Sequence, residues 1–140
     1  MGVKRQYRRT ASRVENCQID VFLCYASPDG AALIDRELYL PREWALDGER
    51  RKEADIPEHV GFATKPQLGV AMLVRALAAD LRGAWVLGDS VYGSGRRLRR
   101  FLEEQGQPFV LAIPSNEPLW WQGPETWSAR TIVAALAPEA

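Results

Sequence analysis

An aspartate at the end of a short apolar run is the residue of this chain best placed to do chemistry. Asp89 follows the run Trp85-Val86-Leu87 after Gly88, and Gly93 closes the polar turn behind it. This pattern predicts a strand whose carboxyl end carries the carboxylate. Open α/β sheets usually bind ligands and metal ions at that end of their strands. In the simpler alternative, Asp89 only accepts hydrogen bonds from backbone N–H groups of the next turn.

Ser90 offers a different chemistry at the same place. The order Gly88-Asp89-Ser90 after a strand resembles the nucleophile block of esterases and lipases with a Gly-Asp-Ser motif. A nucleophilic serine needs a general base, normally a histidine. The single histidine, His59, lies upstream within a charged segment. A serine hydrolase is therefore the less favoured alternative.

Basic residues gather in two places. The 18 basic and 18 acidic residues of the chain cancel, so net charge does not point to a nucleic-acid partner. Their distribution is more informative, because residues 1–13 hold five basic and no acidic side chains. A helix-like segment behind Asp89 carries a second cluster, formed by Arg96, Arg97, Arg99 and Arg100. Such clusters are either phosphate contacts or solvated faces.

The composition is that of an ordinary globular domain. The 140 residues are 46% hydrophobic and 26% charged, and they are numerous enough to bury a core. No apolar stretch approaches the roughly 18 residues of a membrane span, and the N-terminus lacks the apolar region of a signal peptide. We therefore expect a cytoplasmic protein without a membrane partner.

Hydrophobic patterns and turn residues predict the elements that position these side chains. We expect an antiparallel hairpin of two strands, then a charged insertion of short helices and loop, then a helix that Thr64 and Gln67 cap. A strand ending at Asp89, the arginine-rich helix and another strand follow. The expected ranges are 16–27 and 32–40 for the hairpin, 42–60 for the insertion, 64–81 for the capped helix, 94–106 for the arginine-rich helix and 109–113 for the last strand.

Two strands joined through a helix should be parallel, with a right-handed crossover. An antiparallel hairpin that precedes such a βαβ unit is the skeleton of a ribonuclease-H-like fold, an α/β fold with a mixed sheet flanked by helices. We expect residues 1–140 to form a single domain of this kind. Residues 114–140 form a Trp- and Pro-rich segment and the start of a further helix.

Several blocks of the sequence resemble bacterial insertion-sequence transposases of the DDE superfamily. The likeness covers about residues 3–113. Its blocks are Val3-Lys4-Arg5-Gln6-Tyr7, Thr10-Ala11, Val14-Glu15-Asn16-Cys17-Gln18, Leu33-Ile34-Asp35-Arg36-Glu37-Leu38-Tyr39-Leu40-Pro41, Phe62-Ala63-Thr64-Lys65-Pro66, Gly88-Asp89 and Tyr92-Gly93. The chain departs from the family pattern at Arg8-Arg9, where a small pair is expected, and at Ser90, where an acid is common.

The resemblance implies a ribonuclease-H-like catalytic domain in which three carboxylates hold two Mg²⁺ or Mn²⁺ ions for DNA cleavage and strand transfer. Asp89 matches the second carboxylate. The first is expected on a strand before Gly2 and the third on a helix beyond Ala140, so the resemblance implies a truncated, incomplete domain. DNA at the ends of an insertion sequence is the implied partner, contacted by the four arginines, Lys65 and Arg5. The implied location is the nucleoid.

One aspartate is too few for a two-metal site, since divalent ions such as Mg²⁺ require more oxygen ligands. Glu15 and Asp20 are possible further ligands from a neighbouring strand. Otherwise we expect a transposase fragment that is inactive by itself. The non-catalytic alternative is a remnant that binds DNA, or a second copy or the full-length transposase through an unpaired sheet edge.

Overall fold

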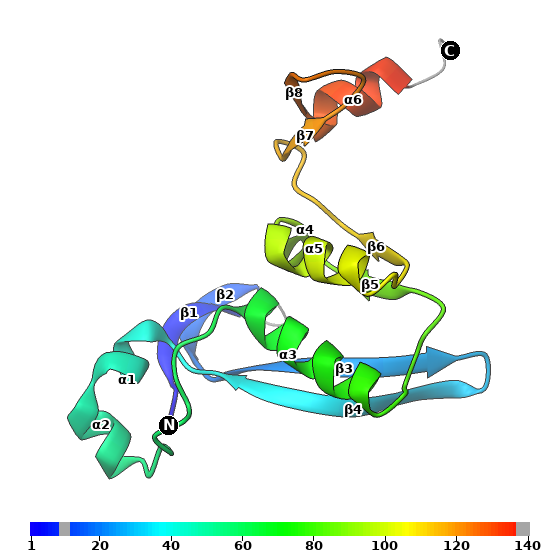
Figure 1. Cartoon of the computed structure of the whole chain (residues 1–140). Helices are drawn as coiled ribbons and strands as arrows, with labels where there is room; N and C mark the ends of the chain where they lie inside the picture. Colours follow the sequence, from blue (N-terminus) through cyan, green and yellow to red (C-terminus); the bar gives the residue numbers. More distant parts are fainter. Residues whose placement is uncertain (9–11, 137–140) are drawn as a thin grey trace. The chain divides into compact units, whose positions relative to one another are not determined.

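The computed structural model describes residues 1–8 and 12–136 (Figure 1). Thr10 and Ala11, one of the family-like blocks, lie outside the described residues. The chain divides into two compact units, Met1–Arg82 and Gly83–Ala140. The described strands form four two-stranded sheets, three antiparallel and one parallel. The α/β class is confirmed, but the described strands are not hydrogen-bonded into one mixed sheet. That residues 1–140 form one incomplete domain stays a prediction.

The first unit begins with a hairpin that the sequence pattern did not predict. Strand β1 (Lys4–Arg8) pairs antiparallel with β2 (Arg13–Cys17), and Arg5 lies opposite Asn16. Most described side chains of the two strands are solvent-exposed. Because polar residues occupy both faces, these strands lack the apolar alternation by which a half-buried strand is recognised. Backbone pairing alone defines them.

The predicted central hairpin is confirmed. Strand β3 (Ile19–Ser27) pairs antiparallel with β4 (Gly30–Tyr39), from Ile19 opposite Tyr39 to Ser27 opposite Gly30. Helix α3 (Lys65–Ala78) packs against both strands, as Figure 1 shows. Buried Val21, Met72 and Leu73 contribute to the core of this unit.

Two short helices occupy the charged segment after the hairpin, as predicted. They are α1 (Arg42–Leu46) and α2 (Gly48–Glu53). The Asp47 side chain accepts a hydrogen bond from the backbone N–H of Arg50 and so caps α2. The indole Nε1 of Trp44 donates to the carbonyl oxygen of Val3 at 2.9 Å, which holds α1 against the start of the chain. That residues 42–60 are an insertion into the domain stays a prediction.

Helix α3 begins where its capping residues predict and ends earlier than expected. The Gln67 N–H donates to Thr64 Oγ1, and the Thr64 N–H donates to Gln67 Oε1, so the capping box is complete. The expected end at Leu81 is wrong. Asp80 adopts a φ of 56°, and the N–H of Leu81 turns back to the carbonyl of Ala76 at 2.9 Å. This Schellman-type end stops the helix at Ala78, although the residue with positive φ is not a glycine.

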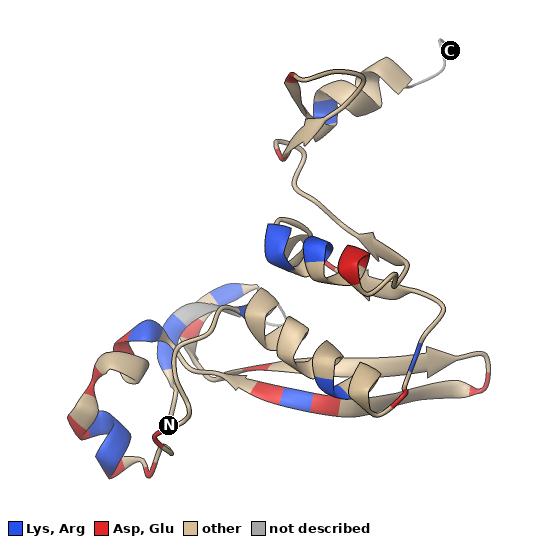
Figure 2. Ribbon diagram, viewed as in Figure 1, with Lys and Arg blue, Asp and Glu red and all other residues tan. Residues whose placement is uncertain are grey.

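Arg75 joins α3 to β4 through two carboxylates. Its Nε lies 2.8 Å from Asp35 Oδ2, and its Nη2 lies 2.6 Å from Glu37 Oε1. Figure 2 shows basic and acidic residues alternating along β4 beside this helix. The hydrogen bond from Arg75 lowers the pKa of Asp35 below its ordinary value, and the two carboxylates raise the pKa of Arg75.

Replacement of Arg75 by methionine should lower the free energy of unfolding by about 1 kcal/mol at pH 7, because two neighbouring carboxylates lose their shared cation in a half-exposed setting. The folded-state pKa of Asp35 is depressed, so this contribution is present above the ordinary pKa of 3.8 and is lost as the pH falls through the folded-state pKa. Urea denaturation at pH 7 and at about pH 3 measures both effects. The matched control is Arg36→Met, at an exposed arginine between the two carboxylates on β4. Equal effects of the two variants at pH 7 would contradict the assignment.

The second unit contains the predicted strand–helix–strand order. Strand β5 (Val86–Gly88) lies parallel to β6 (Phe109–Leu111), as expected. A short helix, α4 (Ser90–Gly93), precedes the arginine-rich helix α5 (Arg96–Glu104), whose Leu98 and Leu102 are buried. The predicted start of α5 at Ser94 is wrong. Gly95 is its N-cap residue, and Ser94 Oγ instead donates to the carbonyl of Ser90.

A small hairpin and a helix complete the described chain. Strands β7 (Pro118–Trp120) and β8 (Thr126–Ser128) pair antiparallel, and α6 (Ala129–Leu136) follows where a further helix was expected. The hairpin itself was not predicted, because three-residue strands are too short to show an alternating pattern. Among the described helices, none is long and apolar enough to cross a membrane.

Candidate functional site

Asp89 lies at the carboxyl end of β5, where the sequence pattern placed it. It is the N-cap residue of α4, and its Oδ1 accepts a hydrogen bond from the N–H of Val91 at 2.9 Å. Its carbonyl oxygen accepts from the N–H groups of Tyr92 and Gly93. The capping role considered for this residue is therefore real. This capping hydrogen bond fixes the orientation of the carboxylate at the strand end.

The glycines around Asp89 allow an unusually close approach of two backbone segments. A Cβ atom on Gly93 would lie 1.9 Å from the carbonyl oxygen of Ala112, just beyond β6. A Cβ atom on Gly88 would lie 2.8 Å from a methyl carbon of Leu111. The N–H of Ala112 also donates to the carbonyl of Gly88 at 2.9 Å. The turn that carries Asp89 is thus pressed onto the end of the parallel strand pair.

Tyr92 covers the strand end beside the aspartate. A Cβ atom on Gly88 would lie only 3.2 Å from the Cβ of Tyr92, so this side chain packs across the residue before Asp89. Burial and then the negative charge of Asp89 raise the pKa of the Tyr92 phenol. The shift indicates that the two side chains belong to one electrostatic environment.

The described residues do not supply the ligands of a two-metal centre. Among residues 1–8 and 12–136, no group of three histidine, cysteine or acidic side chains is arranged to hold a metal ion. Several carboxylates instead bind arginines, including Glu15 with Arg13 at 2.7 Å and Glu117 with Arg99 at 3.2 Å. Asp20 is exposed on β3. Asp89 alone is an insufficient donor set for two divalent ions.

The four arginines of α5 divide into different roles. Arg99 is three-quarters buried and its Nη2 binds Glu117, which places it in the packing between α5 and the start of β7. Arg96 lies over the ring of Trp120 at 5.9 Å, and Arg100 pairs with Glu104 one turn further along α5. Arg97 is exposed. Since successive helical residues turn by about 100°, Arg96, Arg97 and Arg100 share one face of α5. Figure 2 shows the basic residues of the helices in blue.

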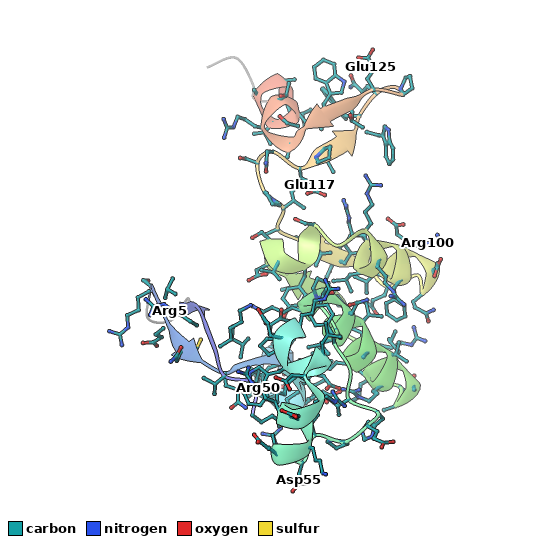
Figure 3. All side chains as sticks on the ribbon, turned by 90° about the vertical axis from the view of Figure 1, so that its left-hand side faces the viewer. Arg5, Arg50, Asp55, Arg100, Glu117 and Glu125 are labelled. Carbon is teal, nitrogen blue, oxygen red and sulfur yellow. The ribbon has the colours of Figure 1, made fainter. Side chains whose placement is uncertain are left out.

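The two other predicted DNA contacts belong to the first unit. Lys65 is the first residue of α3, and its Nζ lies 5.5 Å from the centroid of the Tyr39 ring. Arg5 is exposed on β1 and is labelled in Figure 3. Their contact with DNA stays a prediction.

Ser90 has none of the surroundings of an activated nucleophile. It is the first residue of α4, and its carbonyl oxygen accepts from Ser94 Oγ at 3.2 Å. In the described part of the chain, no hydrogen bond joins Ser90 to a histidine, and His59 is exposed in the first unit. The local structure uses this serine to begin a helix.

Two features of this unit were missed at the sequence level. One is the ion pair between Arg99 and Glu117, which gives Arg99 a packing contact, while its contact with DNA stays a prediction. The other is the packing of Gly93 against Ala112. The spacing of Gly88 and Gly93 around a polar turn was a visible signal of a tight backbone, but it did not identify the contacting strand.

Comparison with known protein families gives a match over most of the chain. The model of a family described as DDE superfamily endonuclease matches residues 1–131. The matched region includes Asp89, the arginines of α5 and both strand pairs on which the ribonuclease-H-like expectation was based. Searches of curated proteins and of solved structures give no match.

Proposed function

The chain belongs to the DDE superfamily of endonucleases, and from this membership we propose that it is part of the catalytic domain of an insertion-sequence transposase. Membership implies interaction with DNA. Enzymes of the superfamily generally use divalent metal ions. The finer proposal is that Asp89 is one of the metal-binding carboxylates, for Mg²⁺ or Mn²⁺. Its position at the end of β5, in a turn fixed by Gly88 and Gly93, supports this role.

We further propose that this polypeptide by itself neither cuts nor transfers DNA. The support is that several of its other carboxylates already form ion pairs with arginines. Asp35 and Glu37 share Arg75, and Glu117 binds a largely buried arginine. Recruiting any of these as a metal ligand would take a carboxylate partner away from an arginine, at a cost in free energy. The absence of a three-ligand group among the described residues also supports this proposal.

The exposed face of α5 favours a second, non-catalytic candidate, which is DNA binding alone. Arg96, Arg97 and Arg100 lie together on this face, close behind the turn that carries Asp89. A further partner is a second copy of the chain or a full-length transposase. The β3–β4 sheet has two strands in the described structure, and such a sheet has backbone edges that can pair with another chain.

A cleavage assay tests the catalytic proposal. The chain is incubated with Mg²⁺ or Mn²⁺ and duplex DNA that carries the terminal repeats of the element, and the products are separated on a denaturing gel. We expect no cleavage above the level of metal alone. Cleavage that is lost in Asp89→Asn, which keeps the capping acceptor, and kept in the exposed control Asp29→Asn would contradict the inactivity and support the role of Asp89. Ester hydrolysis that is lost in Ser90→Ala and persists without metal would indicate a serine hydrolase.

A further inference from the structure

The loop between β7 and β8 encloses a hollow with two tryptophan walls. Its volume is about 300 Å³, and it is lined by Trp121, Gln122, Gly123, Pro124, Glu125 and Trp127. The rings of Trp121 and Trp127 meet edge to face, with 6.4 Å between centroids and an angle of 87°. We call this the indole hollow. Two indole rings at a right angle form a corner that a compact group can enter.

The lining of the indole hollow carries negative charge and no positive charge. The faces of aromatic rings carry negative potential, and Glu125 is the one charged residue of the lining. Within the described chain, Glu125 makes no hydrogen bond or ion pair, whereas the more buried Glu117 binds Arg99. Figure 3 labels both glutamates. Both the rings and the carboxylate therefore attract a cation.

Other aromatic rings of the chain already hold cations. Arg50 lies 5.6 Å from the ring centroid of Trp44, Lys65 lies over Tyr39, and Arg96 lies over Trp120. In residues 1–8 and 12–136, no lysine or arginine lies over Trp121 or Trp127. Within the described residues, the indole hollow therefore combines two tryptophans that have no cation over their rings with a carboxylate that has no hydrogen-bond donor.

We propose that the indole hollow binds a lysine side chain of another protein segment. The ammonium group would lie against the indole faces and donate to the Glu125 carboxylate, while its alkyl stem contacts Pro124 and the ring surfaces. A stacked nucleobase is the competing ligand, since aromatic side chains also bind single-stranded nucleic acid. The Glu125 charge disfavours it, because every nucleotide brings a phosphate of the same sign.

The test uses the full chain and N-acetyl-lysine amide as the probe, followed by NMR of the tryptophan indole N–H signals. We expect saturable shifts of the Trp121 and Trp127 signals at millimolar probe. N-acetyl-Nε-acetyl-lysine amide, which has the same stem without the charge, should bind about tenfold more weakly. Glu125→Gln should weaken binding of the charged probe by about fivefold or more. The matched control is Glu103→Gln, an exposed glutamate of α5, which should leave the titration unchanged.

Three outcomes would overturn the proposal. They are equal binding of the charged and acetylated probes, an unchanged titration in Glu125→Gln, and an absence of saturable shifts at these two indoles. Stronger shifts of the same signals by a nucleoside monophosphate would assign the hollow to nucleic acid instead. None of these measurements depends on Asp89. Their result is therefore independent of the proposal that the chain is part of a transposase catalytic domain.

Discussion

Replacement of Gly93 by alanine is expected to destabilise the second unit by about 3 kcal/mol or more. The added methyl group would lie 1.9 Å from the carbonyl oxygen of Ala112 and 2.8 Å from its carbonyl carbon. These are backbone atoms, so no side-chain rotation relieves the overlap. The contact can be relieved only if the Asp89 turn separates from the end of β6, which would break the packing of α4 on this strand pair.

Amide hydrogen exchange within residues 83–136 measures this effect, because it reports the stability of one unit independently of the other. Protection of the β5 and β6 amides should fall by about two powers of ten, in line with the expected free energy. Gly123→Ala is the matched control, since a Cβ there has no neighbour within 4 Å. Protection in Gly93→Ala equal to that of the control would mean that α4 and β6 do not approach as described.

Simultaneous replacement of Arg96, Arg97 and Arg100 by glutamine should weaken DNA binding by about a hundredfold or more at roughly 50 mM salt. Each arginine that contacts a phosphate releases counterions, so the slope of log affinity against log salt should become shallower by about three. Arg99 is left in place because it binds Glu117, and its loss would disturb packing as well as charge. Fluorescence anisotropy with a labelled duplex, at several salt concentrations, measures both quantities.

A control variant separates local contact from total charge. Replacing Arg36, Arg42 and Lys52 by glutamine removes the same number of positive charges from exposed positions of the first unit. If the α5 face contacts phosphates, this control should weaken binding much less than the α5 variant. Equal losses of DNA affinity in the two variants would show that binding depends on net charge only. The α5 face would then be a solvated surface.

Much of the local structure was predictable. The apolar run before Asp89, the Thr64–Gln67 capping box and the parallel pairing of β5 with β6 were all read correctly, because each depends on neighbouring residues or on a general rule of chain connection. The end of helix α3 was not predicted correctly. Asp80 takes a positive φ there, a conformation for which glycine is the usual signal.

The candidate site was predictable only in part. Its central residue and the basic cluster behind it were identified from residue type and order. The different contacts of the four arginines could not be predicted, because the partner of Arg99, Glu117, comes 18 residues later in the sequence, after β6. In the same way the sequence does not show the ion pairs of Asp35 and Glu37, because the arginine that binds both lies about 40 residues further on, in α3.

The sequence by itself determined the family, the α/β class and the position of Asp89 at a strand end. These three properties follow from short sequence patterns whose residues interact with near neighbours in the chain. They can therefore be recognised from the order of the residues alone. The tertiary structure alone decided which charges are already paired, which arginines face solvent, and why Gly93 has no side chain. Each of these depends on a contact between elements distant in the chain, and only folding brings the contacting atoms together.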